Sequence, residues 1–366
     1  MHKNRGPVYY GDYLQLNKLL DSQLPLSRKY ADESNAESHD EMLFILVHQV
    51  YELWFKQILH DLNAIIDTFS KLYVPESELS NVVQKLERIK KIQSLLIGQF
   101  DVMETMTPMD FLEFRDLLIP ASGFQSTQFR EIEIKLGLST SNRQHVDREF
   151  FLGRLNESDR LKLTDLESSS SLLKLVEKWL ERVPFTNMEN FNFWEEYQKA
   201  IESILKDDQD IIIKNSALLT EAGKNIQLEN LENTRTTFKS LFDEKAHKEL
   251  IQTNQRSLSQ KAILNALFIL LYRDESMLTI PFQVLTALMD IDENFTTWRY
   301  RHALMAQRML GTKIGTGGSS GHVYLKRAAD NNRVFVDLFN LSTFLIPRSR
   351  LPIIPKEVRN KLNFNV

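Results

Sequence analysis

The chain has 366 residues, with 45 Lys and Arg against 49 Asp and Glu, and its formal net charge is −4. This balance gives no electrostatic reason for binding nucleic acid or an anionic membrane surface. The absence of Cys excludes disulfides, thiolate nucleophiles, iron–sulfur clusters and Cys-ligated zinc.

Glycine and proline are scarce, at 12 and 10 residues, which favours long helices over a turn-rich β fold. The first 14 residues lack the apolar core of a secretory signal. The longest apolar runs are far shorter than the roughly 20 residues that span a bilayer. Together with the lack of Cys, these features predict a cytoplasmic protein without a membrane or nucleic-acid partner.

The chain begins with a polar, irregular stretch, and we expect residues 1–37 to form an N-terminal arm before a helical domain at 38–366. Asp40 and Glu41 then precede a long apolar-periodic run that ends at Phe69. Acidic residues favour a helix N-terminus because they face the positive end of the helix dipole. This first helix is apolar over more than half of its surface and is therefore expected at the centre of the fold.

Three further helices are predicted in the first third of the domain. Apolar residues at 3–4 spacing predict one over 81–103. Thr107 and Asp110 can form a capping box around Pro108 at the first helical position, so the next helix starts there and stops before Pro120. A third helix ends at Gly137.

The remainder also reads as helical. Residues 138–165 are predicted to be irregular, with helices at about 166–183, 192–206, 229–250 and 262–272. The longest pattern runs from Pro281 to Gly311, and a glycine-rich loop at 311–321 precedes one or two last helices before Pro347. Because no segment alternates with a sustained period of two, we expect an all-α fold.

Two histidines lie on the most apolar predicted helices. His48 follows Phe44 by one turn, and His302 follows Trp298 by one turn. Each is consistent with a core histidine that hydrogen-bonds internally. The small residues Ala303 and Ala306 beside His302 are also typical of an α-helical haem proximal site.

Two further features are compatible with ligand binding. Arg115 lies one turn after Phe111 on an otherwise apolar face, where it either forms a structural ion pair or binds a carboxylate through its planar guanidinium. The loop at 311–321 contains five Gly, two Ser and two Thr. It lacks the GK[ST] ending of a phosphate-binding loop. The loop is therefore either a flexible linker between helices or a loop that encloses a small polar ligand.

Several long blocks resemble the tryptophan 2,3-dioxygenase family. They are HDEMLFILVHQVYELWFKQIL (39–59), ETMTPMDFLEFRDLLIPASGFQSTQFR (104–130), WRYRHALMAQRMLGTKIGTGGSSG (298–321), VFVDLFNLSTFLIPR (334–348) and YGDYLQL (10–16). The resemblance implies an all-α homotetramer, a dimer of dimers, that binds haem b with Fe(II) in the active form. It implies cleavage of the indole C2–C3 bond of L-tryptophan by O2 to give N-formyl-L-kynurenine, the first step of the kynurenine pathway.

The resemblance also implies roles for individual residues. His302 is expected to be the axial iron ligand, with Trp298 beside it and Ser122 and Gly123 near the haem. His48 is expected to be the catalytic distal histidine that faces the indole N–H.

The remaining implied residues bind the substrate. Phe44 and Phe111 are expected to line the indole pocket, Arg115 to hold the substrate carboxylate, and Thr316 to contact its ammonium and carboxylate groups. The other expected substrate-pocket residues are Ile45, Leu46 and Val47, together with Tyr10, Tyr13 and Leu14 from the arm of a neighbouring subunit. An alternative is a haem-binding sensor, or a diverged dioxygenase that acts on another indole.

Overall fold

The computed structural model describes residues 6–32, 36–138, 153, 155–183, 187–188, 191–311, 313, 321–357 and 359. Its regular structure is almost entirely helical, which confirms the predicted all-α class. Within these residues, β1 (Asn187–Met188) and β2 (Phe191–Asn192) form a two-residue antiparallel pair. Strands of two residues are too short to produce an alternating pattern in the sequence, and they leave the all-α class unchanged.

The helices follow one another along the chain with short connections. The first group is α1 (Tyr10–Leu14), α2 (Leu16–Leu19), α3 (Leu26–Lys29), α4 (Asp40–Phe69), α5 (Glu76–Met103), α6 (Pro108–Arg115), α7 (Thr127–Leu136), α9 (Glu157–Glu167) and α10 (Leu172–Leu180). The second group is α11 (Phe193–Lys214), α12 (Glu221–Ser240), α13 (Glu244–Gln252), α14 (Gln260–Leu271), α15 (Ser276–Leu310), α16 (Gly321–Asn331) and α17 (Val336–Asn340). Short 3₁₀ turns are η1 (Asp116–Leu118), η2 (Gly123–Gln125), η3 (Asn215–Leu218), η4 (Leu341–Phe344) and η5 (Arg348–Arg350).

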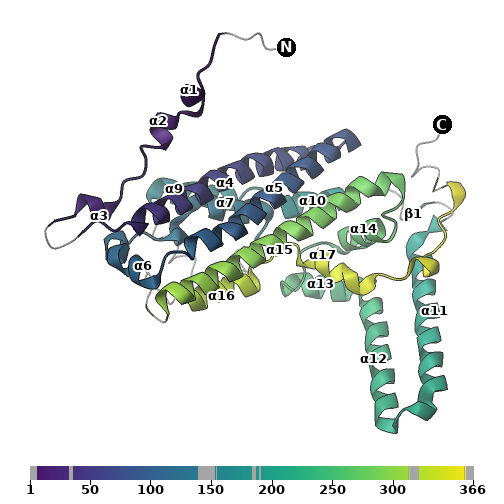
Figure 1. Ribbon diagram of the computed structural model, residues 1–366. Helices are drawn as coiled ribbons and strands as arrows, with labels where there is room; N and C mark the ends of the chain where they lie inside the picture. Colours follow the sequence, from purple (N-terminus) through teal and green to yellow (C-terminus); the bar gives the residue numbers. More distant parts are fainter. Residues whose placement is uncertain are drawn as a thin grey trace.

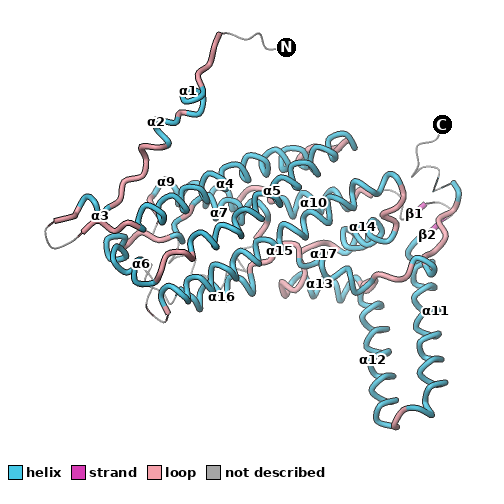
Figure 2. Tube along the Cα trace, in the orientation of Figure 1, coloured by secondary structure: helices cyan, strands magenta, loops and turns pink. Residues whose placement is uncertain are grey.

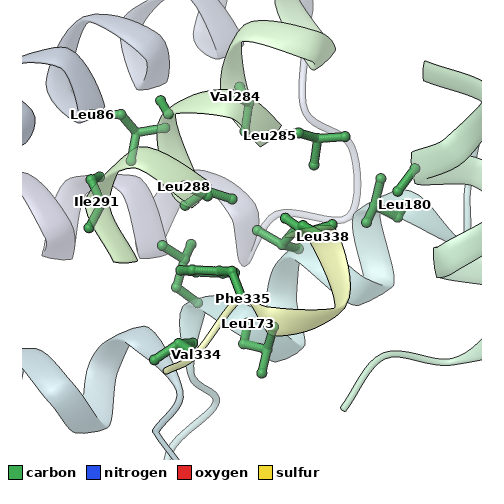
Figure 3. Close-up of a cluster of buried hydrophobic side chains, with 14 of the residues drawn as sticks. Leu86, Leu173, Leu180, Val284, Leu285, Leu288, Ile291, Val334, Phe335 and Leu338 are labelled. Atoms are coloured by element: carbon green, nitrogen blue, oxygen red, sulfur yellow. The ribbon is translucent and has the colours of Figure 1, made fainter. Parts of the chain in front are cut away.

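The long helices α4, α5 and α15 lie side by side and form the centre of the molecule (Figure 1). α7 packs on α4, and α16 packs on α15. Side chains from α5, α10, α15 and α17 interlock in one apolar core, in which Leu86, Leu288 and Phe335 are almost fully buried (Figure 3). Ile58 and Leu62 of α4 belong to the same core, which therefore fixes the two helices that carry His48 and His302 relative to each other.

Local capping sets several of the boundaries that the sequence predicts. The Thr107 hydroxyl accepts from the Asp110 N–H at 3.3 Å, while the Asp110 carboxylate accepts from the Thr107 N–H at 2.9 Å, so the expected capping box is present. Gly137 ends α7 with φ of 122°. A Cβ at that position would lie 2.6 Å from the Leu173 Cβ, and glycine is therefore required there.

Other predicted boundaries were wrong. α9 begins at Glu157 inside the stretch expected to be irregular, and α11 extends to Lys214. The single helix expected at 229–250 is divided, because the Asp243 carboxylate accepts from the Lys245 and Ala246 N–H groups and starts a new helix, α13. Pro281 lies inside α15 rather than at its first position.

Two segments project from the body (Figures 1 and 2). α11 and α12 pair as a long helical hairpin, and α1 and α2 extend from the opposite end. The arm, expected to be irregular throughout, thus contains short helices. It joins the body where the Glu41 carboxylate accepts from the Leu26 and Ser27 N–H groups at 2.7 and 2.8 Å. None of the described helices is long and apolar enough to cross a membrane.

Candidate active site

A cavity lies within the helical body, and its wall contains both histidines singled out from the sequence. Residues of α4, α5, α6, α7, α15 and α16 line it, and its empty space, including the part open to solvent, is about 1430 Å³. His48 from α4 and His302 from α15 both face this space. The histidines are 254 residues apart in the sequence, and the packing of α4 and α15 along α5 brings them to one cavity.

The His48 imidazole is oriented by its own helix. Its Nδ1 lies 2.8 Å from the Phe44 carbonyl oxygen, which can only accept a hydrogen bond. Nδ1 therefore carries the proton and donates it to Phe44. The His48 side chain is exposed to the open cavity, and desolvation by the surrounding protein still lowers its pKa, against smaller opposing effects of this hydrogen bond and of the Glu52 charge. In the neutral ring, Nε2 is then an unprotonated acceptor.

The His302 imidazole is held among aromatic rings. The Trp298 ring centroid is 5.2 Å from that of His302, and the Phe100 centroid is 6.1 Å away. Burial, with a smaller repulsion from His48, lowers the pKa of His302 to about 4. The ring is therefore neutral at physiological pH, which is the form that binds a metal.

Aromatic side chains form the wall near His48. The Phe44 ring lies 4.1 Å from the His48 ring and 5.8 Å from the Phe111 ring, with which it is stacked. Ser122 and Gly123, at the start of η2, also line the cavity. Such an apolar surface with a few polar groups is typical of a site for a flat, mostly apolar ligand.

Three charged residues and one amide that also line the cavity were missed by the sequence analysis. Arg130 and Glu133 on α7, Arg299 on α15 and the nearby Asn332 all line the cavity. Helical spacing contains a signal for one of them, because Arg299 precedes His302 by three residues and shares its face. The same spacing from His48 identifies Tyr51 and Phe55, which also line the cavity.

Most of the residues that the sequence singled out lie in this wall, and some do not. Those in the wall are Phe44, Val47, His48, Phe111, Ser122, Gly123, Trp298 and His302. Ile45 and Leu46 are not among the residues that line the cavity, and Leu46 is exposed. The Arg115 side chain is largely buried, and its Nη1 lies 3.8 Å from the Asp116 Oδ1. Arg115 is not among the residues that line the cavity. Thr316 lies outside the described residues.

The arm residues lie apart from this cavity. Tyr10, Tyr13 and Leu14 belong to α1, where they are 69%, 76% and 41% exposed. α1 extends away from the body of its own chain (Figure 1). These three side chains therefore do not contribute to the cavity of the same chain.

The donor set of the cavity indicates which kind of cofactor fits. No group of three or more His, Asp or Glu side chains able to hold a metal ion occurs in the part of the chain that the structure describes. A bare metal ion needs such a set. A haem instead brings four nitrogen ligands and needs one neutral imidazole from the protein. His302, neutral and set in an aromatic wall, fits that requirement.

Comparisons with known proteins agree with this chemistry. The family model for tryptophan 2,3-dioxygenase matches residues 1–345. Tryptophan 2,3-dioxygenase of Alteromonas mediterranea is 50% identical over 364 residues, which cover 100% of this chain and 99% of the relative. The enzyme of Bdellovibrio bacteriovorus is 50% identical over 98% of this chain and 99% of its own length. That of Dictyostelium discoideum is 44% identical over 98% of this chain and 88% of its own length.

These matches extend over the central helices and over the segments that build the cavity. Identity of this degree over nearly the whole length of both proteins is far above what a shared fold alone produces. The chain belongs to the tryptophan 2,3-dioxygenase family.

Proposed function

We propose that this protein uses haem b to cleave the indole C2–C3 bond of L-tryptophan with O2, giving N-formyl-L-kynurenine. Both oxygen atoms enter the product, and the reaction would open the kynurenine pathway of tryptophan degradation. The observation that carries the proposal is the pair of neutral imidazoles facing one aromatic cavity. We further propose that the protein acts in the cytoplasm.

In this proposal His302 would hold the haem iron. Its imidazole is neutral, and the Trp298 and Phe100 rings beside it restrict its rotation. Ser122 and Gly123, which also line the cavity, would contact the haem. When bound, the iron supplies the site at which O2 is activated.

His48 is proposed to orient the substrate rather than to remove a proton from it. Because its Nδ1 donates to the Phe44 carbonyl, its Nε2 remains an acceptor for the indole N–H. The lowered pKa of His48 keeps this acceptor unprotonated at neutral pH. A hydrogen bond from the indole N–H would fix the ring edge that carries C2 and C3 within the cavity.

The indole ring would lie against Phe44 and Phe111, with Val47 and its neighbours Ile45 and Leu46 forming the adjoining helix surface. A dry apolar pocket of this kind favours the aromatic part of tryptophan. The zwitterionic end needs charged and polar anchors, which we assign to Arg115 for the carboxylate and to Thr316 for the ammonium and carboxylate groups.

We also propose that the active protein is a homotetramer, a dimer of dimers. The support comes from the arm, since short isolated helices such as α1 are unstable without a packing surface. Tyr10, Tyr13 and Leu14 are exposed in their own chain. In the assembly they would cover the active-site cavity of a neighbouring subunit.

The test is an optical assay of the haem-loaded protein. The protein is reduced, mixed with L-tryptophan and air, and followed by the absorbance of N-formylkynurenine. We expect product with the unaltered protein and neither a haem spectrum nor product with His302→Ala. His60→Ala is the matched control, because His60 is exposed on α4 and does not line the cavity.

Two outcomes would contradict the proposal. A haem spectrum without turnover of L-tryptophan would indicate a sensor or a dioxygenase for another indole. A normal haem spectrum in His302→Ala would place the axial ligand elsewhere.

A further inference from the structure

A buried charge network forms part of the cavity wall, and the proposed reaction does not use it. Glu133 on α7 accepts from two arginines, from Arg299 Nη2 at 2.8 Å and from Arg130 Nη1 at 2.6 Å. The three residues are 3%, 5% and 8% exposed. Each oxygen of the Glu133 carboxylate thus has its own guanidinium partner.

The network joins three helices around the segment that carries His302. Arg299 lies on α15, three residues before His302, and its Nη1 donates to the Asn332 carbonyl at 2.7 Å, just beyond the end of α16. The Arg299 guanidinium also lies 6.0 Å from the Phe129 ring centroid. Because α15 is held from α7 and from the end of α16, its rotation about its own axis is fixed at this turn.

A buried ion-pair network of this kind adds little to the free energy of unfolding compared with apolar side chains of similar volume. The cost of removing charges from water offsets most of their mutual attraction, and well-packed apolar side chains stabilise a core about as well. What a buried ion pair supplies is a defined geometry and a local electric field, which is strong where water is excluded.

We propose that Glu133 and Arg299 are positioning residues for the axial ligand, and that the Glu133 carboxylate lowers the reduction potential of the iron that His302 binds. The geometric effect follows from the attachment of α15 to α7 beside His302. The electrostatic effect follows because the carboxylate offsets part of the positive charge of Arg130 and Arg299, and less positive surroundings favour the oxidised iron. The inference rests on the proposed function only in requiring that the cavity holds haem.

The experiment compares two substitutions on the same helix. Glu133→Gln removes the carboxylate that lines the cavity, and Glu131→Gln removes a neighbouring carboxylate that does not line it. Glu131 is a close match, since it is 7% exposed and is paired with Lys162 at 2.7 Å and with Lys135 at 3.5 Å. The readout is the midpoint potential of the haem-loaded protein, from a redox titration followed by its visible spectrum.

We expect Glu133→Gln to raise the midpoint potential. At a fixed potential the ferrous-to-ferric ratio should increase roughly three- to tenfold, the order that one unit charge produces in a partly desolvated environment. Glu131→Gln should leave the potential unchanged, although it also removes a buried carboxylate. Equal potentials in Glu133→Gln and the unaltered protein would overturn the electrostatic part of the inference.

The geometric part has its own test, which also applies if Glu133→Gln fails to fold. Arg299→Lys keeps the positive charge and loses the two-point attachment. We expect it to release haem to an excess of apomyoglobin several-fold faster than the unaltered protein. Arg301→Lys is the control on the same helix, because Arg301 pairs at the surface with Asp101. Equal release rates in both variants would overturn the positioning role.

These results are distinguishable from failure of the proposed function. If the unaltered protein binds no haem, the proposed function fails. If it binds haem but the two matched pairs of variants do not differ, only the present inference fails.

Discussion

The buried carboxylate of Asp292 allows a stability prediction whose size follows from its hydrogen bonds. Asp292 lies on α15 and is 3% exposed. It accepts from the Val334 N–H, at 3.0 and 3.1 Å to its two oxygens, and from the Phe335 N–H at 3.0 Å. These bonds attach the turn before α17 to the central helix.

Asp292→Ala would leave two buried backbone N–H groups without an acceptor. Each such loss costs about 1–3 kcal/mol, so the sum is about 2–6 kcal/mol. Burial raises the pKa of Asp292, which means that the native charge carries a desolvation cost that the substitution relieves. We therefore expect a decrease of about 2–4 kcal/mol in the free energy of unfolding. Asp292→Asn retains one acceptor oxygen and should lose about 1–2 kcal/mol.

The assay is urea unfolding followed by circular dichroism. Asp290→Ala is the control on the same helix, because Asp290 is half-exposed and pairs with Lys90 at 2.7 Å. Surface ion pairs of this kind contribute about 0–1 kcal/mol. An Asp292→Ala variant within 1 kcal/mol of Asp290→Ala would refute the reasoning, since the two N–H groups would then have found other acceptors.

Four further predictions concern the cap of α6 and the cavity. Thr107→Ala should lower the free energy of unfolding by about 1 kcal/mol, measured by urea titration, because it removes the α6 cap. In the haem-free protein His302 has a folded pKa of about 4 against 6.5 unfolded, so protons bind the unfolded state first as the pH falls. Stability should decrease by up to about 3 kcal/mol between pH 6.5 and 4, and a curve identical to that of His302→Ala would contradict this. Arg115→Ala should raise KM for L-tryptophan about 10- to 100-fold, and an unchanged KM would place the carboxylate anchor elsewhere. His48→Ala should keep measurable turnover in the product assay, and complete loss with normal binding of tryptophan and O2 would instead support a proton-removing role.

The sequence contains clear signals for the parts of the fold that depend on local interactions. Asp40 begins α4 as predicted, and the Thr107 capping box begins α6. The apolar surface of the first predicted helix correctly placed α4 at the centre. The boundary at Asp243 before α13 was missed, although its cap is well formed, because an acidic residue inside a polar stretch has many equivalent neighbours.

The cavity was predictable to the extent that its residues share helix faces. His48 and His302 stand out because an imidazole is unusual on an apolar helix, and both line the cavity. The contact between Glu133 and Arg299 was not predictable, since 166 residues separate them and only the packing of α7 beside α15 joins them. Periodicity identifies the face of a helix but not the helix that covers it.

Because the arm is attached to α4, it behaves as a tethered ligand, whose local concentration near the attachment point is high. Besides the Glu41 contacts, Gln23 donates to the Gln49 side chain at 2.6 Å, directly beside His48 in the sequence. Tyr10 is 13 residues from that point, and α1 and α2 occupy most of the stretch between them, so the arm reaches only surfaces near its attachment. Any surface at that range meets the arm at an effective concentration in the millimolar range. A docking surface of modest affinity is therefore occupied by the attached arm nearly all of the time. A separate peptide that ends at Gln23 would need a millimolar concentration to occupy the same surface to the same extent.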